Sequence, residues 1–167
     1  MGTTILGLLA ITLCILPFLG IHLSRKKTEK ELISGLRTIA DACNSKLASW
    51  DCGVEFAIGI SSPKNYLFFY KKRSGTLIKH CVPLFDIQNC TVNCIKRNIQ
   101  NGNISETIID KLELVLIPYN PQKTPIVFVF FNSDEHFRPN GEPPLIKKWE
   151  AIVNDALNER STFPIAS

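Results

Sequence analysis

The sequence contains none of the short motifs that identify common classes of enzyme. It has no Gly-x-Ser-x-Gly elbow, no Walker loop, no dinucleotide-binding glycine pattern and no His-Glu-x-x-His pair. It also lacks internal repeats and low-complexity segments. We therefore expect a protein that is not an enzyme and that uses no cofactor.

Charged residues are missing from residues 5–23, which read ILGLLAITLCILPFLGIHL. A helix of this length rises roughly 29 Å, close to the hydrocarbon thickness of a bilayer. A cleaved signal peptide would carry basic residues before the apolar run and small residues after it, and here the basic residues follow the run. The sequence therefore predicts a transmembrane anchor over residues 1–23.

The basic character of the chain is concentrated directly after this run. Residues 24–50 hold six basic and three acidic residues, whereas residues 51–167 hold 13 basic and 12 acidic ones. The positive-inside rule then places the N-terminus outside and the following domain on the cytoplasmic side of an inner or plasma membrane. Contact with anionic lipid is expected of this flank, and nucleic acid is not an expected partner. Its first four basic residues are Arg25, Lys26, Lys27 and Lys30.

Six cysteines are present, of which Cys14 lies in the apolar run. The other five are an odd number, and a chain of this length can build a core without disulfides. We expect reduced cysteines that pack as small hydrophobic residues, and no metal site. The alternative is a thiol- or metal-dependent protein that uses Cys81, Cys90 and Cys94, with His80 nearby.

Hydrophobic periodicity predicts the order of the elements. Residues 24–50 have apolar side chains at helical spacing, and residues 145–157 form a second amphipathic pattern that includes Trp149. Alternating or continuous apolar runs between them predict six strands, and the last of these is apolar on both faces and so is expected at the centre of a sheet. The predicted strands are 54–60, 66–72, 76–82, 89–98, 108–117 and 126–131.

Two groups of polar residues are candidate sites. Lys64, Lys71, Lys72 and Arg73 surround a predicted hairpin and could bind a phosphate or a lipid head group, although a solvated hairpin tip would look the same. Asp134-Glu135-His136 is a cluster that could bind a metal or transfer protons, although an exposed polar loop explains it as well.

The order of elements resembles a pleckstrin-homology-like domain of bacterial single-span membrane proteins. The residues that carry this resemblance are Ile78–Val92, an apolar strand followed by a corner and an alternating strand, and Trp149 in the last helix. The resemblance implies an α+β fold over residues 51–158: a six- or seven-stranded antiparallel curved sheet or partly open barrel closed by a C-terminal amphipathic helix. Residues 159–167 would be a tail.

Together these features predict a membrane-tethered, non-enzymatic interaction or scaffold domain. Its partner would be another membrane protein or a second copy of itself, met through the sheet, its free edge or the groove beside the last helix. Binding of anionic head groups through the Lys71–Arg73 hairpin is the alternative that the basic residues favour.

Overall fold

The computed structural model describes residues 25–73, 75–101 and 104–161. A helix over residues 25–42 is followed by seven strands and a long C-terminal helix, α2. The strands are β1 (Lys46–Cys52), β2 (Phe56–Ser62), β3 (Tyr66–Arg73), β4 (Thr76–Pro83), β5 (Ile87–Asn101), β6 (Ile104–Pro118) and β7 (Ile126–Asn132), and α2 spans Glu142–Ser161.

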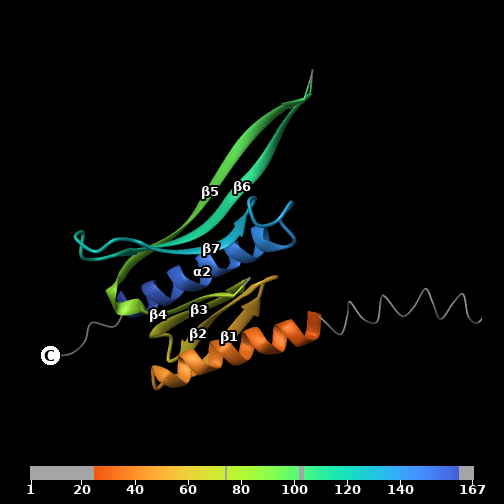
Figure 1. Ribbon diagram of the computed structural model, residues 1–167. Coiled ribbons are helices and arrows are strands. Elements are labelled where there is room, and N and C mark those ends of the chain that lie inside the picture. Colours follow the sequence, from red (N-terminus) through yellow and green to blue (C-terminus); the bar gives the residue numbers. More distant parts are fainter. Residues whose placement is uncertain (1–24, 74, 102–103, 162–167) are drawn as a thin grey trace, which may run out of the picture.

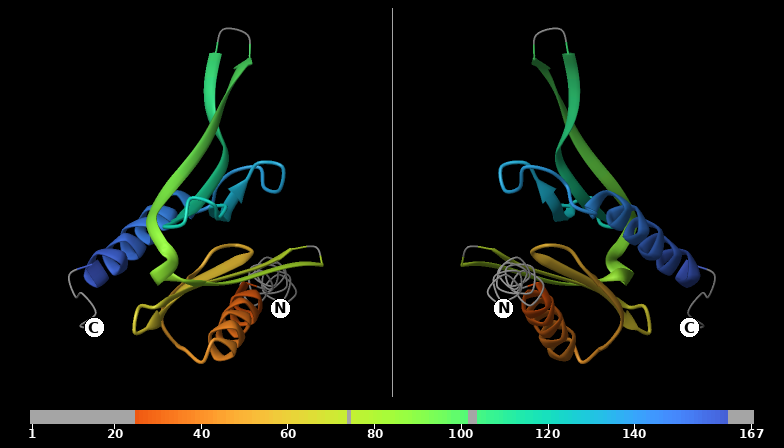
Figure 2. Two further views of the ribbon diagram at one scale, coloured as in Figure 1. Left: turned by 90° about the vertical axis from the view of Figure 1, so that its left-hand side faces the viewer. Right: turned by 90° about the vertical axis from the view of Figure 1, so that its right-hand side faces the viewer.

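The strands form two separate antiparallel sheets. One has the order β1-β2-β3-β4 and the other the order β5-β6-β7. A short 3-10 helix, Leu84–Asp86, carries the chain from the first sheet to the second. The views in Figure 1 and Figure 2 show the helix of residues 25–42 on one side of the first sheet, and α2 with the second sheet on its other side.

The larger hydrophobic cluster lies between the two sheets and α2. Alternate residues of β2 and β3 face inward, as do Leu112, Leu114 and Leu116 of β6. The rings of Phe69 and Phe128 stack with their centroids 4.5 Å apart, which joins the two sheets directly. α2 completes this cluster with side chains that include the fully buried Trp149.

A smaller cluster lies on the outer side of the first sheet. The N-terminal helix contributes Leu32, Leu36, Ile39 and Ala40, and the sheet contributes residues that include Ala57, Phe68 and Tyr70. Gly35 lets the helix approach closely, because a Cβ atom there would lie 2.3 Å from the Tyr70 ring. The apolar stripe predicted for this segment therefore packs on its own domain.

The N-terminal helix is shorter than the predicted 24–50 segment. Asn44 adopts a positive φ of 49°, the Asn44 N–H donates to Asp41 O, and the Ser45 N–H donates to Ala40 O. This pair of hydrogen bonds is the Schellman ending of a helix, with Asn in the left-handed position. Residues 46–52 consequently form β1 and not the end of the helix.

The prediction of one curved sheet or partly open barrel is wrong. The chain forms a four-stranded and a three-stranded sheet, with no closed barrel among the described residues. β7, expected at the centre because it is apolar on both faces, is an edge strand. The expectation failed because apolar residues on both faces of a strand do not determine whether both of its edges pair with other strands.

The predicted single-pass membrane architecture is also contradicted for the part of the chain described. Between residues 25 and 161, with the gaps given above, neither helix combines the length and the apolar character needed to cross a bilayer. Residues 5–23, which suggested the anchor, lie outside the described residues.

Candidate functional site

The cations of the predicted basic hairpin pair with several different acidic residues. Side chains alternate between the two faces of a strand, so Lys71 and Arg73 point toward the second sheet, whereas Lys72 points toward the N-terminal helix and pairs with Glu31 there. Lys64, in the turn between β2 and β3, pairs with Glu159 of α2 at 2.7 Å. The four cations therefore do not form one surface for a phosphate.

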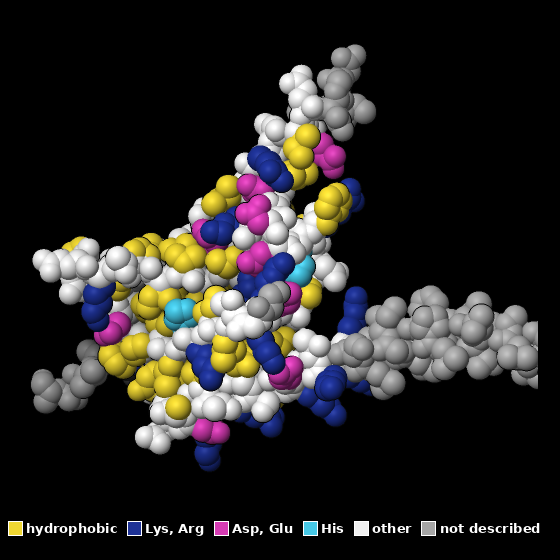
Figure 3. All heavy atoms as spheres, in the orientation of Figure 1, with side chains coloured by type: hydrophobic (Ala, Val, Ile, Leu, Met, Phe, Trp, Pro, Cys, Tyr) yellow, Lys and Arg dark blue, Asp and Glu magenta, His cyan; other side chains and the backbone are white. Residues whose placement is uncertain are grey.

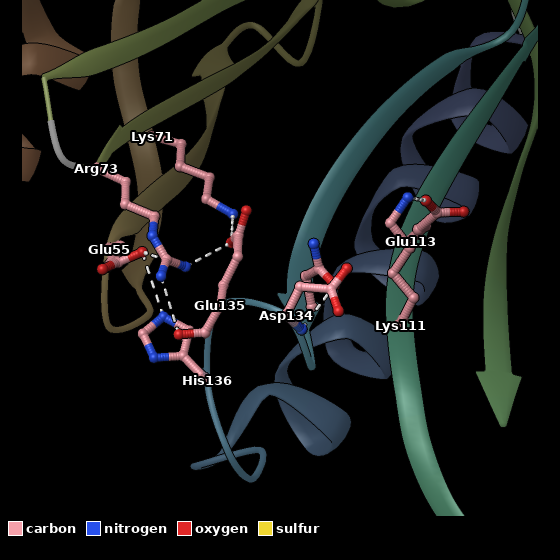
Figure 4. A network of polar contacts seen from close by, with 9 residues as sticks. Glu55, Lys71, Arg73, Lys111, Glu113, Asp134, Glu135 and His136 are labelled. Atoms are coloured by element: carbon pink, nitrogen blue, oxygen red, sulfur yellow. Dashed lines mark hydrogen bonds and ion pairs between the residues drawn. The ribbon is translucent and has the colours of Figure 1, made fainter. Parts of the chain in front are cut away.

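Lys71 and Arg73 belong to a partly buried ionic network (Figure 4). The Lys71 Nζ atom donates to Glu135 Oε2 at 2.8 Å, and Arg73 lies 3.0 Å from the same oxygen and 3.6 Å from Glu55 Oε2. His136 Nε2 lies 3.2 Å from Glu55 Oε2. The network connects the loop after β7 to the first sheet, so it joins the two layers.

Glu135 is held in its charged form by this network. Burial on its own would raise the pKa of the Glu135 carboxyl, but the hydrogen bond and charge of Lys71 and the charge of Arg73 outweigh it, and the pKa is lowered. Of the predicted Asp134-Glu135-His136 cluster, Glu135 and His136 enter the network, while the Asp134 N–H donates to Asn132 Oδ1. The described residues contain no group of three or more side chains arranged to hold a metal ion.

The structure does not bring the predicted thiol site together. Cys81 forms a disulfide with Cys43, which differs from the expectation of reduced cysteines. Cys90 is buried in the larger cluster, and burial, with the nearby Glu150 charge, raises its pKa to about 12. Cys94 is exposed. His80 points to the opposite face of β4 from Cys81, against the ring of Phe128.

A cleft of about 1020 Å³ lies between the N-terminal helix, the end of β1 and the start of α2. It contains Arg25 of the basic flank, and the other three cations of that flank are exposed on the helix. Burial, with the charges of Glu29 and Asp51, raises the pKa of Cys52 in this cleft to about 11, which makes its thiol a poor nucleophile. Asp51 accepts hydrogen bonds from Lys148 and Trp149.

The more informative surface is the outer side of the second sheet. Because Leu112, Leu114 and Leu116 face the core, the alternate residues Val115 and Ile117 face outward. Val115 is paired with Val127, and Glu113 with Val129, so aliphatic side chains of β6 and β7 adjoin. Neither described helix covers this side of the sheet (Figure 2).

The same surface continues along the hairpin of β5 and β6. These strands have 15 residues each, but β7 pairs with β6 only as far as Lys111. We call residues 95–101 and 104–110 the arm, which projects well beyond the rest of the molecule (Figure 1). All side chains of β5 from residue 93 to residue 100 are exposed.

One side of the arm is continuous with the outer side of the sheet. Register and alternation place Ile95, Arg97 and Ile99 of β5 on that side, next to Ile108 and Glu106 of β6. We call this continuous surface the open face. Its aliphatic residues are Val115, Ile117, Val127, Val129, Ile95, Ile99 and Ile108, and its charged residues are Lys111, Arg97 and Glu106, with the buried Glu113 beside Lys111.

Hydrophobic side chains are visible over the second sheet and at intervals along the arm, between charged ones (Figure 3). Val127, Ile95 and Ile99 are each about 40% exposed, at 40%, 42% and 41%. The charges are partly neutralised, because Lys111 lies 2.7 Å from Glu113 and Arg97 lies 3.2 Å from Asp110. The open face is thus an amphipathic surface with few isolated charges.

The free edge of β5 is protected only near its base. There the Cys90 N–H donates to Asn154 Oδ1 and Asn154 Nδ2 donates to Cys90 O, so one amide side chain of α2 satisfies both backbone groups. The Val92 N–H donates to Glu150 Oε1. These contacts occupy the positions that a pairing strand would take, and on the arm no helix supplies them.

The open face has one signal in the sequence, and that signal is also typical of a buried strand. Residues 126–131 are apolar on both faces, which is expected of a buried strand but also of a strand whose second face meets another molecule. Comparison with protein families, with curated proteins and with solved structures finds no match to this chain. The resemblance to a pleckstrin-homology-like domain therefore stays a prediction.

Proposed function

We propose that this chain is a non-enzymatic interaction module that binds a protein partner through the open face. The observation that carries the proposal is the uncovered aliphatic side of β5–β7, continued along a projecting arm. Hydrophobic side chains that lie in a contiguous patch, rather than singly, are typical of protein-binding surfaces.

The arm gives independent support. An isolated two-stranded hairpin is marginally stable in water, and it gains stability when it packs against something else. Neither described helix packs on the arm, and Ile95 and Ile99 are 42% and 41% exposed there. A partner that covers the arm would bury these side chains and order the two strands together.

The polar groups singled out from the sequence point to a structural role. Lys71 and Arg73 form ion pairs with Glu135 across the contact between the two layers, and Arg73 and His136 both lie beside Glu55. Such a network fixes the second sheet, and hence the open face, relative to the first sheet. Phosphate binding at Lys71 would have to displace the carboxylate of Glu135.

The size of the expected effect follows from exposure. Full burial of a valine or isoleucine side chain contributes about 1.5–3 kcal/mol, and about two fifths of this remains to be gained at Val127, Ile95 and Ile99. These three residues would together contribute roughly 2–4 kcal/mol to binding. A lysine at one of them would also place a charge in the contact.

The test compares Ile99→Lys with Gln100→Lys in the full-length protein expressed at its natural level. The two positions are adjacent on β5 but point to opposite sides of the arm. The assembly that contains the protein is sized in gentle cell extracts. We expect an assembly larger than one 18.7 kDa chain, lost in Ile99→Lys and kept in Gln100→Lys. A monomer-sized native protein, or equal behaviour of the two variants, would overturn the proposal.

A further inference from the structure

We infer that the partner bound by the open face of the arm is a second copy of this chain, packed antiparallel against the same face. This inference rests on the proposed function and names the occupant of that surface. The order of charged and aliphatic groups along the arm favours a second copy.

From the base of the arm to its tip, the residues of the open face occur in three successive rows. The row nearest the sheet pairs Ile95 with Lys111, the middle row pairs Arg97 with Ile108, and the row nearest the tip pairs Ile99 with Glu106. Each row thus contains one aliphatic and one charged residue. The charge is positive near the sheet and negative near the tip.

A two-fold axis through the middle row places this pattern opposite a complementary pattern on the second copy. The axis exchanges the row nearest the sheet with the row nearest the tip, so Ile99 of one copy meets Ile95 of the other. Glu106 meets Lys111 in the same exchange, and symmetry repeats both contacts. An isologous contact requires such self-complementarity, and two sheets packed face to face are compatible with this arrangement.

The remaining charge in the middle row is already neutralised within each copy. Arg97 Nε lies 3.2 Å from Asp110 Oδ1, so two copies of Arg97 near the axis would bring two ion pairs together and not two bare cations. The side chain of Lys111 is 37% exposed beside Glu113, so its ammonium group can donate to a second carboxylate. Glu106 is exposed, and no ion pair to it occurs among the described residues.

The contact is short, so the association is weak. Seven residues at about 3.4 Å each, across two strands about 5 Å apart, cover roughly 240 Å² per copy. Stable interfaces bury about 800 Å² per partner. We therefore expect a weak dimer that forms at high micromolar concentrations and dissociates on dilution.

The test uses sedimentation equilibrium of the purified full-length protein with two charge reversals. In Glu106→Lys both ends of the contact are positive, and in Lys111→Glu both are negative. Each variant alone should dimerise at least tenfold more weakly than the native protein. In an equimolar mixture each lysine meets a glutamate across both contacts, so heterodimers should form with near-native affinity.

Lys96→Glu is the matched control, because Lys96 lies on the opposite side of the arm from Arg97. It should leave the dimer unchanged, and circular dichroism should show that all three variants are folded. A native protein that stays monomeric at roughly 100 µM, or a mixture no tighter than its components, would overturn the inference.

The two proposals fail in different ways. If the purified protein is monomeric while Ile99→Lys still reduces the assembly from cells, the second copy is excluded and the open face binds another protein. If that assembly is insensitive to Ile99→Lys, both proposals are wrong.

Discussion

The contact between Asn154 and the edge of β5 makes a prediction about stability. Asn154 forms two hydrogen bonds with the backbone of Cys90, at 3.1 Å to its N–H and 2.8 Å to its carbonyl oxygen. Cys90 is only 2% exposed. In Asn154→Ala both backbone groups lose their partner at a site with little access to water.

The magnitude follows from the cost of leaving buried polar groups unpaired. Each unsatisfied group costs about 1–3 kcal/mol, and Asn154 itself is half-buried, so water can reach part of the space that its side chain leaves. We expect a loss of about 2–4 kcal/mol in the free energy of unfolding. For a chain of this size, 1 kcal/mol corresponds to a shift in Tm of about 2–4 °C.

The assay is urea unfolding of the native protein, of Asn154→Ala and of Asp155→Ala. Asp155 is the next residue of α2 and is exposed, so its replacement should change stability by less than about 0.5 kcal/mol. Hydrogen exchange of the Cys90 amide should accelerate in Asn154→Ala alone. If Asn154→Ala and Asp155→Ala were equally stable, the amide side chain would not be the protection of this edge.

Three further predictions concern the layers beneath the open face. Lys71→Met should cost about 1–3 kcal/mol, because it leaves the half-buried Glu135 with Arg73 alone. Lys72→Met, at an exposed pair, should lower stability clearly less, and similar urea midpoints for the two variants would contradict this. Because the pKa of Glu135 is lowered in the folded protein, its stabilisation is complete above its ordinary value of 4.5 and is lost as the pH falls below it. Glu135→Gln should therefore flatten the acid side of a plot of stability against pH, and an unaltered slope would be the contrary result. Gly59→Ala places a Cβ atom 2.6 Å from the side chain of Leu47 and 3.0 Å from a backbone oxygen, so thermal unfolding should show a loss of about 1–3 kcal/mol, and an unchanged midpoint would contradict the close packing.

Local elements were largely accessible from the sequence. Alternation predicted strands at 66–72 and 76–82, and the structure has β3 and β4 at nearly the same positions. The strand predicted over 108–117 lies within β6, where the alternate residues Leu112, Leu114 and Leu116 are all buried. An alternating pattern shows which face of a strand is buried. It can be recognised from the sequence because the residues that form it are close together in the chain.

The arrangement of these elements was not accessible in the same way. β1 was missed because the apolar spacing of the N-terminal helix continues past Asn44, and only the backbone of Asn44 shows that the helix ends there. The division into two sheets was missed because alternation does not state which strands pair. Leu84–Asp86, expected as a corner, turns the chain into a second sheet.

The site shows the same limit. Lys71 and Glu135 are 64 residues apart in the chain, and no local pattern indicates that they meet. The basic hairpin therefore resembled an anion-binding surface, although its four cations face three different directions. The open face was visible only as a strand without polar residues, and its lack of a cover is a property of the whole fold.

The division of the hydrophobic side chains into two clusters affects how the protein unfolds. The helix of residues 25–42 contributes to the smaller cluster and to none of the larger one. It can consequently separate from the first sheet while the layer between the sheets remains intact, which defines a unit of local unfolding with its own, lower free energy. The Cys43–Cys81 disulfide limits that separation to the part of the helix before Cys43. The molecule thus has a cooperative centre that carries the arm and an outer layer that opens from its N-terminal end.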